Sequence, residues 1–153
     1  MPTPKKNIVI VSPALKQANN GNWQTAFRWS RFLAPRYTVS ILPEWKLGSD
    51  SPDVMIALHA RRSADSIQTY AKAFPDRPLV VVLTGTDLYQ DIRNDLAAQR
   101  SLDLASHLVV LQEEGALELT PMLQKKCRTI YQSARLLKPT PLHKNNFDVI
   151  LVG

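Results

Sequence analysis

Short runs of β-branched and aliphatic residues alternate along the chain with segments in which apolar residues recur every three or four positions. Several runs are apolar almost throughout, which is typical of parallel strands that are buried on both faces. These runs predict six strands, at Asn7–Ser12, Tyr37–Leu42, Val54–His59, Leu79–Thr84, His107–Gln112 and Arg128–Gln132.

The first predicted helix fills the interval after the first strand. Asn22 can cap its N-terminus, and Pro35 ends it. We expect its apolar stripe to lie on the sheet, and to consist of Trp23, Ala26, Phe27, Ser30, Leu33 and Ala34.

Potential N-cap residues and prolines predict three more helices. Ser63 can open a helix whose apolar stripe repeats until Pro75, through Ala64, Ile67, Ala71 and Phe74. Asn94 can open a third helix that runs to about Ser106, and Thr120-Pro121 places a proline at the first position of a short fourth. The alternation of strands and helices predicts βαβ units, and therefore an α/β, Rossmann-like, doubly wound and mainly parallel sheet.

The last residues differ in character from the rest. Residues 136–146 read LLKPTPLHKNN, a polar stretch with prolines that is typical of a linker. Residues 147–153 read FDVILVG, which echoes the strand at the start of the chain and ends on a glycine. We expect residues 1–135 to form one Rossmann-like domain, 136–146 to link it to a second, and 147–153 to open that second domain. The alternative is that this tail adds a last strand to the same sheet.

Composition narrows the classes of protein. The chain has 153 residues, 44% of them hydrophobic, which suits one ordinary globular domain. Cys127 is the single cysteine, so no internal disulfide can form, and no set of Cys and His residues has the spacing of a zinc site. The first apolar run is too short for a signal peptide or a membrane span, so we expect a cytoplasmic protein.

The net charge of +6 favours an anionic partner. The basic residues are scattered, and the chain has neither a nucleic-acid-binding motif nor a set of stacking aromatic residues. We therefore expect a small phosphate-bearing ligand, and neither a nucleic acid nor a membrane.

Polar residues follow the predicted strands at their carboxyl ends, where open parallel sheets bind ligands. His107 begins its strand and falls at the opposite edge, and His143 falls in the linker, so His59 is the well-placed histidine. The residues that we expect to share one edge are Ser12, the loop 19–22, His59, Arg61, Arg62, the turn 84–87, Gln112, Glu113, Gln132 and Ser133.

Each of these positions also has a purely structural interpretation. Gly21 and Asn22 can form a turn and a cap, or a helix N-terminus that receives a phosphate. The chain has no GxGxxG fingerprint, which argues against NAD. Arg61 and Arg62 can be solvated or can clamp an anion. His59 can simply be hydrogen-bonded at a strand end, and Asp87 can brace its turn. Among the aromatic residues, we assign Trp23, Phe27 and Trp29 to the core.

Several segments resemble one enzyme family. They are LHARRSADSI at 58–67, VVLTGTDLYQDI at 81–92, RSLDLASHLVVLQ at 100–112 and IYQSA at 130–134. These segments are similar to those of the selenosugar synthases of selenoneine biosynthesis, which are GT-B glycosyltransferases related to glycosyltransferase family 4. The opening IVIVSPA and the segment GNWQTAFRWSRFL at 21–33 also resemble the start of that family. The resemblance extends from about Asn7 to Gly153.

The resemblance implies transfer of a sugar from a nucleotide diphosphate sugar, such as a UDP-sugar, to selenophosphate, which gives a 1-selenosugar with loss of phosphate. In such enzymes the N-terminal domain holds the acceptor, and the C-terminal domain grips the nucleotide sugar. This sequence departs from the family because it ends at the strand that opens the donor domain, and it lacks the acidic pair found downstream. We expect these 153 residues alone to be inactive. No metal and no cofactor beyond the nucleotide sugar co-substrate is implied.

The chemistry of that reaction suggests roles for the edge residues. Selenophosphate is already an anion with a nucleophilic selenium, so the protein mainly has to collect and aim it. Cations and N–H groups suit that task, and the expected substrate-binding residues are Gly21, Asn22, Arg61, Arg62, Thr84, Gly85, Thr86 and Ser133. Gly21 and Asn22 could also stabilise the leaving diphosphate. A hydroxyl acceptor would instead need a base, for which His59 and Asp87 are the catalytic candidates.

Two other functions remain open from the sequence. One is a family 4-like glycosyltransferase with a hydroxyl or thiol acceptor. The other is a non-enzymatic α/β module that binds a phosphate ligand. A response-regulator-like or methyltransferase α/β domain is disfavoured, because the acidic cluster expected after the first strand is missing.

Overall fold

The computed structural model describes residues 4–134, 136, 138 and 149. Within them, six strands form a single sheet in which every neighbouring pair is parallel, in the order β2-β1-β3-β4-β5-β6. The strands are β1 (Asn7–Val11), β2 (Thr38–Leu42), β3 (Val54–Leu58), β4 (Leu79–Leu83), β5 (His107–Val110) and β6 (Cys127–Thr129). The predicted α/β, Rossmann-like parallel sheet is confirmed.

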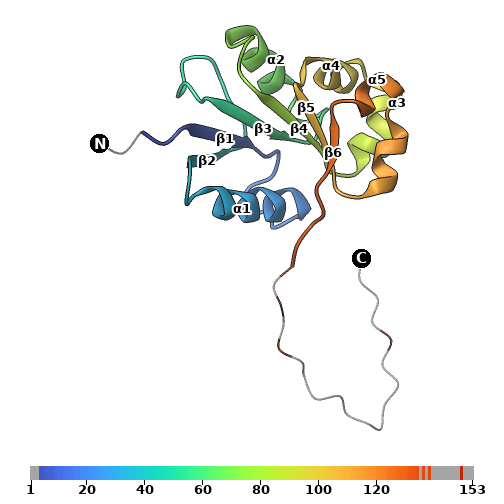
Figure 1. The fold of residues 1–153 in the computed structure, drawn as a ribbon, viewed down its shortest axis with the longest axis horizontal. Coiled ribbons are helices and arrows are strands. Elements are labelled where there is room, and N and C mark those ends of the chain that lie inside the picture. Colours follow the sequence, from blue (N-terminus) through green and yellow to red (C-terminus); the bar gives the residue numbers. More distant parts are fainter. Residues whose placement is uncertain (1–3, 135, 137, 139–148, 150–153) are drawn as a thin grey trace.

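Helices cover both faces of the sheet (Figure 1). On one face lies α1 (Gly21–Leu33), and on the other lie α2 (Ala64–Ala73) and α4 (Leu96–Leu104). The described residues also form four short helical segments: the π-helical turn η1 (Asp87–Asp91), α3 (Ile92–Asn94), the 3₁₀ segment η2 (Glu113–Glu118) and α5 (Pro121–Gln124).

The last strand begins and ends earlier than predicted. The sequence pattern placed it at Arg128–Gln132, but β6 runs from Cys127 to Thr129. Ile130 still donates its N–H to the carbonyl of Val110. The chain then leaves the sheet, and the side-chain amide of Gln132 donates to Thr25 Oγ1 of α1 at 3.0 Å. The polar end of the predicted strand therefore crosses to α1 and does not extend the ladder.

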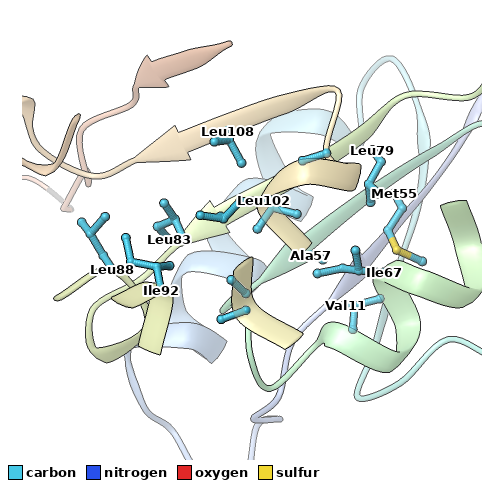
Figure 2. Packing of buried hydrophobic residues seen from close by; sticks show 14 of the residues in the cluster. Val11, Met55, Ala57, Ile67, Leu79, Leu83, Leu88, Ile92, Leu102 and Leu108 are labelled. Atoms are coloured by element: carbon cyan, nitrogen blue, oxygen red, sulfur yellow. The ribbon is translucent and has the colours of Figure 1, made fainter. Parts of the chain in front are cut away.

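The larger part of the core lies between the sheet and the layer of α2 and α4 (Figure 2). Alternate residues of the central strands point into it, among them Met55, Leu83 and Leu108. Ile67 of α2 and Leu102 of α4 meet them from the helical layer, and all five are at most 2% exposed. Burying an aliphatic side chain of this kind contributes about 1.5–3 kcal/mol. This cluster is therefore the main source of the stability of the fold.

The opposite face is packed against α1. The predicted stripe of α1 was partly wrong: its buried residues are Thr25 and Ala26, with Trp29 and Leu33 packed beside them. Phe27 is 41% exposed and stacks on Trp23 with their ring centroids 5.5 Å apart, so it lies outside the core to which we assigned it. The face turned to the sheet follows the spacing 26, 29 and 33, which rotates Phe27 to its border.

Two helix caps differ from the prediction by one or two residues. Asn20, and not Asn22, caps α1, because its side chain accepts the N–H of Trp23 at 3.2 Å. Asp95, and not Asn94, caps α4 by accepting the N–H of Ala98 at 2.8 Å. Extended backbone at both capping residues turns the side-chain oxygen toward the free N–H groups of the first turn.

The other two helix starts agree with the sequence. Thr120 caps α5, and Pro121 is its first residue. Ser63 immediately precedes α2 as predicted, but its hydroxyl donates to the carbonyl of Leu58 at 2.6 Å and makes no capping bond. The serine therefore holds the loop after β3 and not the end of the helix.

The expected linker and the strand of a second domain fall almost wholly outside the described residues, so the division at residues 136–146 stays a prediction. Among the helices of the described part, none has the length and the apolar character that crossing a membrane requires.

Candidate functional site

The carboxyl ends of all six strands meet at one edge of the sheet, toward the right in Figure 1, because every pair is parallel. We call this edge the carboxyl edge. The chain reverses its winding direction at β1, which lies between β2 and β3. Open α/β sheets bind ligands outside the carboxyl ends of the strands near such a reversal. The candidate site therefore lies in the loops that follow β1, β3 and β4.

The loop after β3 begins with a residue in an unusual conformation. His59 has a φ of 70°, in the left-handed region that residues with a side chain rarely adopt. Its neighbours hold it there, since Ser63 bonds to Leu58, and Ser101 of α4 donates to the carbonyl of Ala60 at 2.8 Å. Such strain costs about 1–3 kcal/mol, persists only where surrounding bonds enforce it, and clusters at functional sites.

Asp87 joins this loop to the turn after β4. Its side chain is fully buried. One carboxylate oxygen accepts the N–H groups of Thr84 and Gly85 at 3.0 and 2.9 Å, and the other accepts the N–H of Ala60 at 2.9 Å. Of the two roles expected for Asp87, this geometry favours the brace, because both carboxylate oxygens bind backbone inside the protein.

The imidazole of His59 is also buried, with the residue only 3% exposed. Its Nδ1 accepts the backbone N–H of Arg62 at 3.3 Å. Its Nε2 lies 3.2 Å from the hydroxyl of Thr86 and 4.0 Å from a carboxylate oxygen of Asp91. Burial lowers the pKa of His59 below its ordinary value, against the opposing pull of Asp87 and Asp91. The ring is therefore neutral at pH 7.

The two arginines of the loop are in different situations. Arg61 donates through Nε to Asp91 at 2.9 Å, so its charge is already paired. Arg62 is exposed, and its guanidinium has no hydrogen bond or ion pair with any described residue. Both carboxylates of the cluster are turned inward, with the Asp91 side chain 14% exposed and Asp87 fully buried. Arg62 therefore presents the better candidate for an anion clamp.

The turn after β4 lines a pocket of about 300 Å³ between the ends of β4 and β5. Thr84 and Gly85 form one wall, and Gly85 has a φ of 152°. Tyr89 and Gln112 form another wall, and the amide of Gln112 donates to the hydroxyl of Tyr89. Thr86 is exposed beside this pocket. Two of the expected substrate-binding residues thus line a cavity at the carboxyl edge.

The remaining candidates lie at the N-terminus of α1. Gly21 is its first residue and is exposed, and Asn22 follows it half-buried. Gln132 bonds to Thr25 on the same helix, which brings the exposed Ser133 to this end of the carboxyl edge. Within the described part of the chain, no hydrogen bond joins these residues to the His59 loop. They can contribute to the same site only through a ligand that spans the edge.

The cluster rests on packed side chains. Leu88 and Ile92 follow the turn in η1 and α3, and both belong to the core (Figure 2). Gly115 of η2 packs against Leu88 and Val110, where a Cβ would lie 3.0 Å from Leu88 Cδ2 and 3.1 Å from Val110 Cβ. A rigid base of this kind holds the backbone N–H groups and hydroxyls of the turn in fixed positions.

Sequence reasoning assigned no role to Asp91 or Tyr89. Asp91 pairs with Arg61, and Tyr89 forms a wall of the pocket. Both belong to η1, a π-helical turn, and such turns are frequent at functional sites. The spacing of Asp87 and Asp91 was the available signal, because carboxylates four residues apart on a helical turn fall near each other.

Among the described residues, no group of three or more His, Cys, Asp or Glu side chains is placed to hold a metal ion. No model of a known protein family matches the chain, and a search of curated proteins found no significant match.

Proposed function

We propose that this chain is the acceptor-side domain of a cytoplasmic glycosyltransferase of the GT-B type. It acts with a donor-binding domain that follows it, and the enzyme transfers a sugar from a nucleotide diphosphate sugar to selenophosphate. The proposal rests on the resemblance of its segments to selenosugar synthases and on the chemistry available at the carboxyl edge.

One observation carries the proposal. The two most specific segments of the resemblance, at 58–67 and 81–92, lie next to each other and form a single hydrogen-bonded cluster. Asp87 of the second segment accepts the N–H of Ala60 in the first, and the His59 ring contacts Thr86. The cluster leaves Arg62 and Thr86 exposed and turns its carboxylates inward, which suits an anionic acceptor better than a neutral one.

The reaction would proceed by displacement at the anomeric carbon. The selenium lone pair forms the C1–Se bond while the C1–O bond to the nucleotide diphosphate breaks, and the electron pair leaves with the diphosphate. Water then cleaves the Se–P bond, giving inorganic phosphate and the 1-selenosugar. Arg62 would balance the charge of the phosphoryl group, and Thr84, Gly85 and Thr86 would orient it.

The N-terminus of α1 provides a second place for negative charge. Gly21 and Asn22 expose the first N–H groups of a 13-residue helix, whose dipole favours an anion. In the assembled enzyme this end of the edge would face the leaving diphosphate. Arg62 and α1 would thus serve the two anionic parts of one reaction.

The test uses the chain joined to its following domain. The protein is incubated with a nucleotide sugar and selenophosphate, and the products are identified by mass. A selenosugar and an equivalent of inorganic phosphate are the expected products, and reactions without selenophosphate are the control. Parallel reactions with a thiol and a hydroxyl acceptor distinguish a selenosugar synthase from a glycosyltransferase that uses those acceptors. Turnover with those acceptors alone would replace the proposal by a family 4-like enzyme, and the absence of any transfer would favour a binding module.

A further inference from the structure

The buried ring of His59 makes a separate contact at each of its nitrogens. Nδ1 accepts the backbone N–H of Arg62, and a backbone amide has no alternative to donating. A nitrogen that accepts this bond cannot itself carry a proton. In the neutral ring the proton is therefore on Nε2.

The position of that proton determines how Thr86 is hydrogen-bonded. Nε2 lies 3.2 Å from Thr86 Oγ1 and 4.0 Å from the nearest oxygen of Asp91, so Thr86 is the closer acceptor. A hydroxyl that accepts from an N–H keeps its own proton for another partner. No described residue takes that proton, and Thr86 is exposed at the carboxyl edge.

We propose that His59 is a positioning residue: it donates from Nε2 to Thr86 and so aims the Thr86 hydroxyl proton at a phosphoryl oxygen of the bound substrate. This inference rests on the proposed function and assigns a chemical group to its acceptor site. Arg62 is the second donor, and the exposed parts of the cluster then offer donors to an oxyanion.

The surrounding charges agree with an oxyanion. Asp87 uses its oxygens on three backbone N–H groups, and Asp91 pairs with Arg61. The carboxylates near the ring are thus engaged within the protein. A carboxylate facing the ligand would repel a phosphoryl group, whereas a hydroxyl donor beside a guanidinium attracts it.

The first experiment measures the tautomer. The 153-residue chain is labelled with ¹⁵N-histidine, and long-range proton–nitrogen correlation spectra are recorded at pH 7, with His59 identified by the loss of its signals in His59→Asn. The expected spectrum is that of a neutral ring protonated at Nε2. A ring protonated at Nδ1, or a mixture of the two tautomers, would overturn the proposal.

The second experiment measures anion binding with inorganic thiophosphate, followed by the amide signals of the turn 84–86. Thr86→Val, which removes the hydroxyl, should weaken binding about tenfold, and Thr86→Ser should restore it to within about threefold, because a hydrogen bond to an anion carries such a share of the affinity.

His59→Asn separates positioning from folding. Asparagine tolerates positive φ, and its side-chain oxygen can accept the Arg62 N–H, but it is too short to reach Thr86. We expect this variant to unfold at the wild-type temperature and to bind thiophosphate as weakly as Thr86→Val. The double variant should bind no more weakly than either single one, because both changes remove the same interaction.

Three results would refute the inference: no thiophosphate binding by the wild-type chain, wild-type affinity in Thr86→Val, or losses that add in the double variant. These measurements need no transferase activity. If they succeed while the joined enzyme makes no selenosugar, the proposed function fails and the positioning role of His59 stands. If the enzyme is active but Thr86→Val binds normally, only the positioning role fails.

Discussion

The buried carboxylate of Asp87 accepts the backbone N–H of Ala60 at 2.9 Å and thereby ties the loop after β3 to the turn after β4. The two residues lie 27 positions apart in the sequence, and the contacts of His59 with Thr86 and of Arg61 with Asp91 join the same two segments. The same side chain also closes its own turn through Thr84 and Gly85. This carboxylate is fully buried, and it binds backbone groups of both loops.

Replacing that carboxylate should destabilise the protein. Asp87→Ala leaves three backbone N–H groups without their acceptor, and we expect it to lower the free energy of unfolding by about 3 kcal/mol or more. Asp87→Asn keeps one acceptor oxygen and should lose less. Urea unfolding measures both, with Asp76→Ala as the control, because Asp76 is exposed and has no side-chain partner among the described residues. Equal stability of wild type and Asp87→Ala would contradict the bracing role.

The two arginines should differ in their effect on substrate binding. Arg62→Ala removes a guanidinium that no described residue engages, and should raise the KM for selenophosphate about tenfold. Arg61 is held by Asp91, so Arg61→Ala should raise it only about threefold. Steady-state kinetics of the joined enzyme compare the two variants, and Arg28→Ala on α1 serves as a control for lost positive charge. An unchanged KM in both loop variants would exclude an anion clamp at this loop.

The stability of the protein should fall in mild acid because of His59. Burial holds its pKa in the folded protein below the ordinary value of about 6.5. Below that value the unfolded chain binds a proton that the folded chain does not, so the free energy of unfolding decreases as the pH falls toward the folded pKa. Urea midpoints between about pH 7.5 and pH 5.5 measure the effect. His59→Asn keeps the other two histidines and should show a smaller decline; an identical decline would assign the effect to other groups.

Replacing Gly115 by alanine tests the packing beneath the site, and the same replacement at Gly21 is the control. A Cβ at Gly115 would press on Leu88 and Val110 at 3.0 and 3.1 Å, so Gly115→Ala should cost about 1–3 kcal/mol of stability. A Cβ at Gly21 meets nothing within 4 Å, so Gly21→Ala should leave stability nearly unchanged. Thermal unfolding distinguishes them. A tolerated alanine at 115 would mean that η2 can move away from the core.

Lys126 fastens the C-terminal end of α4. Its ammonium donates to the carbonyls of Leu102, Asp103 and Ala105 at 2.8, 3.1 and 2.7 Å. Burial lowers the pKa of Lys126, against the opposing pull of Asp103, and a positive charge at this end of α4 complements the helix dipole. Lys126→Met keeps the aliphatic stem and should lower the free energy of unfolding by about 1–3 kcal/mol, whereas Lys125→Met, at an exposed position, should change it by less than about 0.5 kcal/mol. Similar losses in the two variants would contradict the capping role.

The sheet could be predicted from the sequence because its central strands are continuous apolar runs. A run such as Leu79–Leu83 is apolar on both faces, and that pattern fits a central parallel strand. Caps were less readable, because Asn20 and Asn22 have the same side chain and both precede an apolar stripe. The choice between them follows from the turn before the helix, where Asn19 has a φ of 41°. The spacing of apolar residues carries no information about that angle.

The sequence predicted which edge of the sheet the candidate residues share, but not the contacts that they make. The parallel sheet puts residues 59–62 and 84–87 at one edge, and that rule needs no side-chain geometry. Which arginine is paired depends on Asp91, and its position in η1 departs from the 3.6-residue period used to interpret helices. The direction in which Asp87 points depends on its contact with Ala60, which joins two separate loops.

The buried and the exposed side chains of the carboxyl edge differ in how freely they can be substituted. Ser63, Asp87 and Ser101 bind the backbone from within, whereas Arg62 is exposed and its guanidinium makes no bond to a described residue. We therefore expect substitutions of the Arg62 side chain to cost little folding stability. Such a scaffold separates an exposed position that can be substituted from the buried groups that hold the two loops together.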